Sequence, residues 1–335
     1  MSAIKTILEY FRLIRFSTVG NEAGVILLGG FMMGQRDMFH IFLLFIIGML
    51  GHIYGYVLNE YVDVETDKKL KYDIKKPLVS GAIPKINALI ISISAAILAF
   101  ILVLYFYRNI LSLALLLVAA VLTAIYDIYG KKIPFSDFIV AGTLGVFLLF
   151  GASTVSSNLP NVVFITALIF FFDVVFMNFV EGGLKDIDHD GLAGAKTMAI
   201  RFGVKVKENK LIIPIKFKAF GYSLRLIFFS LVFWLMLQPQ IRLLSLGLSI
   251  NLILVILLSL IVIFASYKLL HFPIFDKSKL YKLFTLTNSC SVSLLLIVLF
   301  PLLGIWVTIF LFLLPITWFV VFNYLLYKKT TQALV

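Results

Sequence analysis

The sequence predicts an all-α, polytopic membrane bundle of nine or ten transmembrane helices. Hydrophobic residues make up 61% of the 335 residues, whereas ordinary soluble domains use about 45–50% apolar residues. These residues gather in runs of roughly 20, the length that crosses about 30 Å of hydrocarbon as a helix. Lysine and arginine are confined almost entirely to alternate connections between the runs, an asymmetry that is typical of membrane proteins.

The first sixteen residues predict an amphipathic helix. Ile4, Ile7, Leu8 and Phe11 recur at helical spacing. The segment lacks the unbroken apolar core and the small-residue cleavage site of a signal peptide. We therefore expect this helix to lie in the membrane interface.

Ten apolar runs follow, and each predicts one transmembrane helix. Asn21 and Glu22 weaken the first run, and only residues 301–304 separate the last two, so nine helices are the alternative to ten. The runs centre on residues 17–34, 38–60, 86–106, 109–127, 135–153, 161–180, 222–238, 243–268, 283–300 and 304–327.

The basic residues predict the orientation of the chain. If ten helices alternate across the bilayer, every lysine and arginine except Arg36, Arg108 and Arg242 lies on the side of the two termini. Since cytoplasmic loops carry such an excess, we expect both termini to be cytoplasmic, in the cell membrane. The net charge of +12 then reflects topology and attraction to membrane lipids with anionic headgroups. The lysines are scattered over several loops, which argues against a nucleic-acid partner.

Two connections on the basic side, residues 61–85 and 181–221, are much longer than the others. They are four helices apart, which hints at a duplicated four-helix unit, although no residue-level repeat is visible. We expect residues 1–335 to form a single membrane domain in which these two loops lie together at the cytoplasmic face. The single cysteine, Cys290, excludes intramolecular disulfides and thiolate metal sites.

Each long loop carries a ladder of acidic side chains. Asn59, Asp63 and Asp67 stand at i, i+4 and i+8, which places them on one helix face if the second transmembrane helix continues. Asp186 and Asp190 repeat the i, i+4 spacing. Stacked carboxylates repel each other unless they share a cation, and Mg²⁺ is commonly held by one or two carboxylates together with substrate phosphates. The two ladders therefore predict a magnesium-bound diphosphate between them.

Basic side chains close to the ladders are candidates to bind the remaining phosphate oxygens. They are Lys68, Lys75 and Lys76 in the first loop, Lys131 and Lys132 after the fourth helix, and Lys185, Lys196 and Arg201 in the second loop. The simpler alternative is a solvated charged surface, which the matching spacing of two ladders disfavours. A secondary transporter is the alternative from another functional class, but transport would place the key charges near the bilayer midplane.

The motifs resemble those of the UbiA superfamily of intramembrane prenyltransferases. The run N-x3-D-x3-D at 59–67, followed by KKPLVSGAI at 75–83, is similar to the first family signature, with Lys76 where arginine is common. The run YDIYGKK at 126–132 is similar to a third, looser element. The second signature, D-x3-D leading into G-x-[KR]-T, is matched by Asp186, Asp190, Gly194, Lys196 and Thr197. The resemblance spans roughly residues 10–300.

This resemblance implies a bundle with a central cavity, capped on the cytoplasmic side by the two long loops, in which Mg²⁺ clamps a polyprenyl diphosphate donor of geranylgeranyl length or longer. Prenyl transfer would pass through an allylic carbocation. The ladders would supply the metal ligands Asp63, Asp67, Asp186 and Asp190, assisted by Asn59. The substrate-binding residues would be Lys76, Tyr126, Lys131, Lys196 and Arg201.

The resemblance leaves several acceptors open. We expect a quinone-type aromatic ring, with an ether-lipid enzyme like digeranylgeranylglyceryl phosphate synthase as the alternative. The chain departs from the family pattern at Asn178 and Glu181, where an Arg-Glu pair is common, in the longer connection at 205–222, and in the helix at 304–327, which is additional to the customary nine. His52, which is ionisable and lies within a predicted span, either lines the cavity or is hydrogen-bonded between helices.

Overall fold

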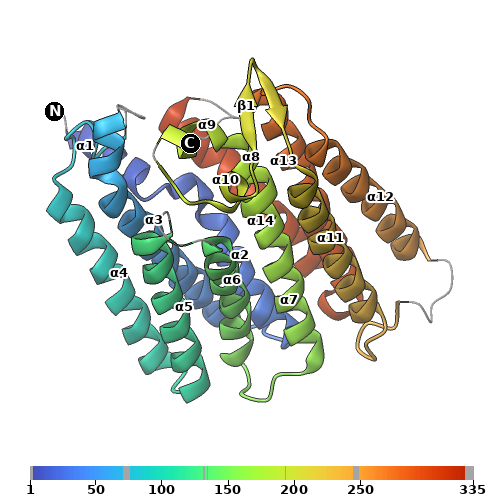
Figure 1. Ribbon diagram of the computed structural model, residues 1–335. Coiled ribbons are helices and arrows are strands. Elements are labelled where there is room, and N and C mark those ends of the chain that lie inside the picture. Colours follow the sequence, from blue (N-terminus) through green and yellow to red (C-terminus); the bar gives the residue numbers. More distant parts are fainter. Residues whose placement is uncertain are drawn as a thin grey trace. The chain divides into compact units, whose positions relative to one another are not determined.

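The computed structural model describes residues 3–70, 76–130, 133, 135–192, 194–243 and 249–328. It confirms the all-α prediction, because a two-stranded hairpin is the one sheet among these residues (Figure 1). Within this part of the chain, nine helices are long and apolar enough to cross a membrane. The first predicted run, at 17–34, forms a helix of only 14 residues, shorter than the roughly 20 that a bilayer requires.

The helices follow the predicted order. The long helices are α2 (Val19–Met32), α3 (Met38–Leu70), α4 (Lys85–Phe106), α5 (Ile110–Tyr129), α6 (Ser136–Ser153), α7 (Asn161–Phe176), α11 (Ile215–Met236), α12 (Ile250–Leu270), α13 (Lys277–Leu303) and α14 (Ile305–Tyr327). The shorter elements are α1 (Ala3–Leu13), a 3₁₀ turn η1 (Phe16–Thr18), a π-helix η2 (Met177–Gly182), α8 (Gly183–Lys185), α9 (Ile187–Leu192), α10 (Met198–Arg201), β1 (Lys205–Lys207) and β2 (Lys210–Ile212).

Capping residues start two helices earlier than the apolar runs predicted. Pro214 precedes α11, and its carbonyl accepts bonds from Phe217 N and Lys218 N, as expected for a residue that fixes φ but offers no N–H group. Asp276 caps α13 by accepting a hydrogen bond from Lys279 N at 3.1 Å. Polar first turns therefore hid both starts from a hydropathy reading.

A single glycine separates the last two helices. Helix α13 continues through Pro301, and Gly304, with φ of +76°, lies between Leu303 and Ile305. Glycine adopts this left-handed conformation without the steric cost that a Cβ imposes. The connection predicted at residues 301–304 is therefore a single residue, Gly304.

The described contacts group the chain into two compact units. Unit 1 comprises Met1–Ile128, Val146–Leu159 and Ile309–Val335, and unit 2 comprises Tyr129–Gly145 and Pro160–Thr308. In unit 1, α2 packs backbone to backbone against α6, because a Cβ on Gly29 or on Gly151 would lie well inside contact distance of the carbonyl oxygen of Leu148 or of Ile26. Small residues permit such close approach in membrane bundles.

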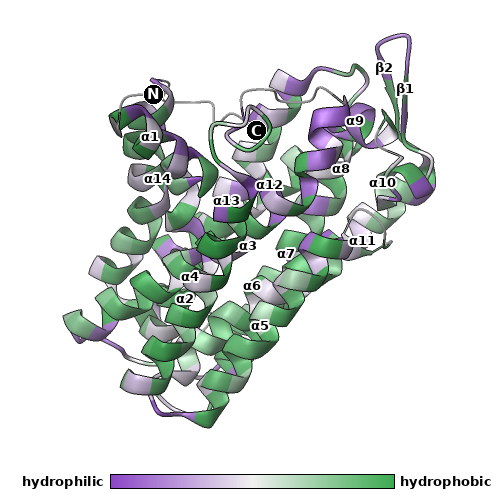
Figure 2. Cartoon of the chain, turned by 90° about the vertical axis from the view of Figure 1, so that its left-hand side faces the viewer, coloured by the Kyte–Doolittle hydropathy of each residue, from purple (hydrophilic) through white to green (hydrophobic). Residues whose placement is uncertain are grey.

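Unit 2 is built around an aromatic core. Phe179 stacks on Phe217 with ring centroids 4.5 Å apart, and Phe202 packs on both edge-on. Within the predicted 181–221 loop, the structure places α8, α9, α10 and the hairpin, whose turn residues Glu208 and Asn209 both have positive φ, as a two-residue type I′ turn requires. Figure 2 shows the long helices as largely hydrophobic and the hairpin and α9 as largely hydrophilic.

Candidate functional site

The first ladder lies entirely on helix α3. This helix runs without interruption to Leu70, so Asn59, Asp63 and Asp67 occupy successive turns, and residues 61–70 are helical rather than part of a loop. Each step of four residues turns about 40° around the axis, which keeps the three side chains on adjacent parts of one face. Asp67 is buried, whereas Asn59 and Asp63 are partly exposed.

A series of ion pairs holds the C-terminal end of this ladder, at Asp67, in place. Lys76 Nζ donates to Asp67 Oδ2 at 3.1 Å and lies 3.1 Å from Glu60 Oε1. Arg15 Nη2 donates to the same Glu60 oxygen at 2.6 Å. Arg15 adopts a left-handed backbone conformation, with φ of 47°, which is uncommon outside glycine and marks a locally constrained residue. Glu60 and Arg15 were not identified from the sequence, since neither belongs to a spaced motif.

The pKa of Lys76 is raised above its ordinary value. Burial alone would lower this pKa, but the carboxylates of Glu60 and Asp67 outweigh the burial. Lys76 therefore carries its positive charge at neutral pH, and this charge is lost when the pH rises past its raised pKa. Among the described residues, Lys76 on the first ladder and Lys185 on the second are predicted phosphate ligands that lie beside a ladder carboxylate.

Asp127 extends the first ladder onto helix α5. Asn59 Nδ2 donates to Asp127 Oδ1 at 3.3 Å, and Asp63 lies close enough for the two carboxylates to repel each other. Asp127 is buried, and its Oδ2 has no hydrogen-bond partner within the described residues. The neighbouring Tyr126 is partly exposed. Tyr126 was predicted from the sequence but Asp127 was not, although an acid within an apolar span was a usable signal.

The second ladder, in unit 2, consists of two carboxylates that lie one helical turn apart. Asp190 N donates to Asp186 O at 2.8 Å, so the two carboxylates are carried on consecutive turns around α9. Lys185 Nζ lies 3.5 Å from Asp186 Oδ2, and His189 Nδ1 lies 3.9 Å from Asp190 Oδ1. A further acid, Asp137 at the start of α6, is close enough to Asp190 to repel it.

Asp188 is different from its two neighbours. Its Oδ1 lies 3.0 Å from Lys277 Nζ, and both side chains are more than 40% exposed. It therefore belongs to an ordinary surface ion pair between α9 and α13. This acid offers a natural control for experiments on the ladder.

The second ladder follows a π-helix, η2, which carries two of the residues that depart from the family pattern. Asn178 donates to Val174 O. Glu181 is 2% exposed, and neither of its carboxylate oxygens has a hydrogen-bond partner among the described residues. Single π-turns inside helices frequently mark functional sites.

Other predicted residues are placed less closely. Lys196 and Arg201 are exposed in and beside α10. Lys131, Lys132 and Lys75 lie outside the described residues. His52 is buried, with Nδ1 2.9 Å from Glu22 Oε2 and Nε2 2.9 Å from Ile14 O, which supports the alternative of a hydrogen-bonded histidine between segments.

The donor chemistry of both ladders suits a hard divalent cation. Asn59, Asp63 and Asp67, like Asp186 and Asp190, present only oxygen donors, as Mg²⁺ prefers. In the part of the chain that the structure describes, no three acidic, histidine or cysteine side chains gather into a complete metal cage. A pair of carboxylates is a partial ligand set for Mg²⁺, which commonly takes one or two carboxylates and completes its shell with phosphate and water.

Comparisons with known proteins find similar sequences and folds among prenyltransferases. The model of the UbiA prenyltransferase family matches residues 23–289. A digeranylgeranylglyceryl phosphate synthase from Hyperthermus butylicus is 30% identical over 159 residues, covering 45% of this chain and 51% of the relative. A 4-hydroxybenzoate octaprenyltransferase from Cupriavidus pinatubonensis is 32% identical over 173 residues, covering 51% of this chain and 59% of the relative. The matches thus span about half of each curated relative.

Solved structures share the fold. A structure described for digeranylgeranylglyceryl phosphate synthase in membranes superposes with a TM-score of 0.67 at 22% identity, covering 90% of this chain and 100% of that chain. A UbiA homolog from Archaeoglobus fulgidus bound to GPP and Mg²⁺ gives a TM-score of 0.62 at 17% identity, covering 89% and 100%.

Proposed function

Since this chain belongs to the UbiA prenyltransferase family, we propose that it transfers a polyprenyl group from its diphosphate to a small lipid or aromatic acceptor inside the membrane. The observation that carries this proposal is the pair of acidic ladders, each with carboxylates one helical turn apart and each beside a membrane-length helix. Family membership disfavours the alternative of a secondary transporter.

The ladders would hold Mg²⁺ against the donor diphosphate. The proposed ligands are Asp63 and Asp67 on α3 and Asp186 and Asp190 at α9. Asn59 is positioned by its bond to Asp127 and would complete the first ladder. The magnesium-bound homolog from Archaeoglobus fulgidus supports this metal. When bound, Mg²⁺ neutralises the charge that develops on the departing diphosphate oxygens.

The chain's own cations would complete the chemistry. Lys76 is held in place by Glu60 and Asp67, and its ammonium would donate to a diphosphate oxygen as the bond from that oxygen to C1 breaks. The bonding electrons leave with the diphosphate, and the allylic carbocation remains. Lys131, Lys196 and Arg201 are proposed as further contacts to the donor. The ring of Tyr126 would offer a π face to the cation, and the acceptor then attacks C1 and loses a proton.

The comparisons support more than one acceptor class, and two of them match the acceptors expected from the sequence. The 4-hydroxybenzoate octaprenyltransferases support an aromatic acceptor of the quinone type. The digeranylgeranylglyceryl phosphate synthases support a glyceryl phosphate acceptor. Incubation of the purified chain with labelled geranylgeranyl diphosphate and either acceptor, followed by identification of the lipid product, separates these two classes.

Magnesium-dependent release of diphosphate tests the ladders. We expect Asp63→Asn and Asp190→Asn to lower turnover by roughly 100-fold or more, because each removes charge stabilisation at the leaving group. The matched controls are Glu65→Gln on α3, an exposed acid paired with Lys85, and Asp188→Asn on α9. Both controls should retain nearly normal turnover. Normal turnover of the ladder variants, or equal losses in the controls, would contradict the assignment.

A further inference from the structure

We propose that the β-hairpin and the adjoining ends of α11 and α12 form a binding site for the headgroup of an anionic phospholipid. This inference concerns the segment at 205–222, to which the proposed prenyl chemistry assigns no role. It depends on the membrane location of the chain and not on its catalytic activity. All of the residues involved belong to unit 2.

Backbone hydrogen bonds fix the hairpin to the connection between α12 and α13. Leu211 N donates to Pro273 O at 3.1 Å, and Phe275 N donates to Asn209 O at 2.9 Å. Lys210 and Ile274 form an antiparallel bridge between these two bonds. The hairpin is therefore held against the α12–α13 connection by backbone hydrogen bonds.

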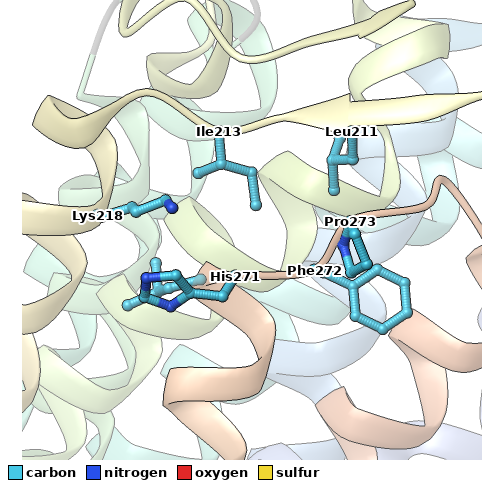
Figure 3. A pocket seen from close by; sticks show the side chains of 7 residues that line it. Leu211, Ile213, Lys218, His271, Phe272 and Pro273 are labelled. Carbon is cyan, nitrogen blue, oxygen red and sulfur yellow. The ribbon is translucent and has the colours of Figure 1, made fainter. Parts of the chain in front are cut away.

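A cavity of about 220 Å³ lies between the hairpin segment and the adjoining ends of α11 and α12. It is lined by Leu211, Ile213, Lys218, Leu270, His271, Phe272 and Pro273. Figure 3 shows Lys218 and His271 together on one side of the cavity, with Ile213 and Leu211 coming from the hairpin segment and Phe272 and Pro273 opposite them. Two cationic or hydrogen-bonding side chains thus line the cavity beside apolar ones.

The histidine is oriented for a ligand. His271 Nδ1 lies 3.0 Å from the carbonyl oxygen of Tyr267, and because a carbonyl only accepts, Nδ1 carries the proton. Nε2 is then the ring nitrogen left for a phosphate oxygen, to which it donates when the ring is in the imidazolium form. The ring stacks on Tyr267 with centroids 4.4 Å apart, and Tyr222 Oη lies 3.3 Å from Nδ1.

The charge around the cavity favours an anion. Residues 205–218 contain five lysines and a single acid, Glu208. The nearby Asp276 is occupied by the α13 cap and by Lys279, whose Nζ lies 3.4 Å away. Lys218 also sits in the first turn of the 22-residue helix α11, where the helix dipole attracts negative charge. A phosphate group matches this combination.

The surrounding surface indicates that the phosphate belongs to a lipid. Only 22% of an apolar 18-residue stretch of α12 is buried. On the same helix, Leu260 and Phe264 are 57% and 58% exposed. Leu226 on α11 is 69% exposed. Tyr222 and Tyr267 stand where such apolar surface meets the basic end, as aromatic residues do at membrane interfaces. Acyl chains could lie along these helices while the headgroup occupies the cavity.

Native mass spectrometry of the full chain, titrated with phosphatidylglycerol or with phosphatidylcholine of the same acyl composition, tests this site. We expect the wild-type chain to prefer phosphatidylglycerol. Lys218→Gln and His271→Gln should each weaken that binding by roughly fivefold or more, whereas Lys218→Arg should preserve it. The matched control is Lys69→Gln, an exposed lysine at the end of α3, which should bind as the wild type does.

Three results would overturn the proposal. The first is equal affinity for the two lipids. The second is unchanged phosphatidylglycerol binding in both glutamine variants, each checked for a wild-type helical circular dichroism spectrum. The third is thermal stabilisation by inorganic phosphate that equals stabilisation by phosphatidylglycerol, because it would identify a site for a free anion and not for a lipid.

Discussion

At the scale of single residues, Arg225 shows how this chain neutralises charge inside a membrane-length helix. Its Nη1 donates to Asp173 Oδ1, its Nε donates to Ser266 Oγ at 3.0 Å, and its guanidinium lies 3.6 Å from the ring centre of Phe176. Both charged side chains are less than 10% exposed. Pairing of this kind offsets much of the cost of burying the two charges.

We expect Arg225→Met to lower the free energy of unfolding by about 3–5 kcal/mol, because it leaves Asp173 buried without its partner. The double variant Arg225→Met/Asp173→Leu should recover most of this loss, since an apolar pair of similar volume replaces the ion pair. Thermal unfolding of detergent-solubilised protein measures both effects. Additive losses in the double variant would show that the two residues act independently.

At the scale of the elements, the crossing of α2 and α6 is set by glycine. Gly29 and Gly151 bring the two helix backbones into direct contact. Gly48 on α3 does the same against α2, since a Cβ there would lie 2.7 Å from the Cα of Ala23. These contacts explain how α2, with only 14 residues, keeps a defined place in unit 1.

Gly151→Ala should destabilise the protein by about 1–3 kcal/mol or more, because the new methyl group meets the Ile26 carbonyl oxygen, which cannot move without shifting α2. The matched control is Gly24→Ala, also in unit 1, where an added Cβ meets nothing within 4 Å. That control should be neutral or slightly stabilising, because alanine favours helices. Comparison of the two melting temperatures is the measurement, and equal values would argue against a glycine-set crossing.

At the scale of the whole molecule, the charge asymmetry predicts a cytoplasmic hairpin. In a Cys290→Ser background, Glu208→Cys in the hairpin turn and Ser157→Cys between α6 and α7 should lie on opposite sides of the membrane. In right-side-out vesicles, we expect a membrane-impermeant maleimide to label Ser157→Cys directly and Glu208→Cys only after permeabilisation. Labelling of both sites, or the reverse order, would refute the predicted orientation.

Hydropathy and spacing predicted most of the fold, because long apolar runs and charge asymmetry are visible without tertiary information. The early starts of α11 and α13 were missed, since Pro214 and Asp276 act through backbone capping and not through apolarity. The hairpin was also missed, because its turn depends on positive φ at Glu208 and Asn209 and contains no glycine.

The candidate site was predictable to a similar depth. Regular spacing exposed the ladders, since i and i+4 carboxylates read directly from the sequence. Spacing could not reveal partners that are distant in the sequence, such as Asp127, which is 68 residues from Asn59. Arg15 was equally hidden, because its contact with Glu60 spans 45 residues and depends on a left-handed backbone.

The shared ammonium of Lys76 has a thermodynamic consequence. As long as Asp67 holds Lys76, that carboxylate is partly satisfied and is a weaker ligand for a cation. A diphosphate that draws Lys76 away would release Asp67, so each ligand should strengthen the other's binding, with equal and reciprocal coupling. Calorimetric titration of pyrophosphate with and without Mg²⁺ should show this cooperativity, reduced in Lys76→Gln beyond any loss of intrinsic affinity. Independent binding of pyrophosphate and Mg²⁺ would show that Lys76 only stabilises the folded structure.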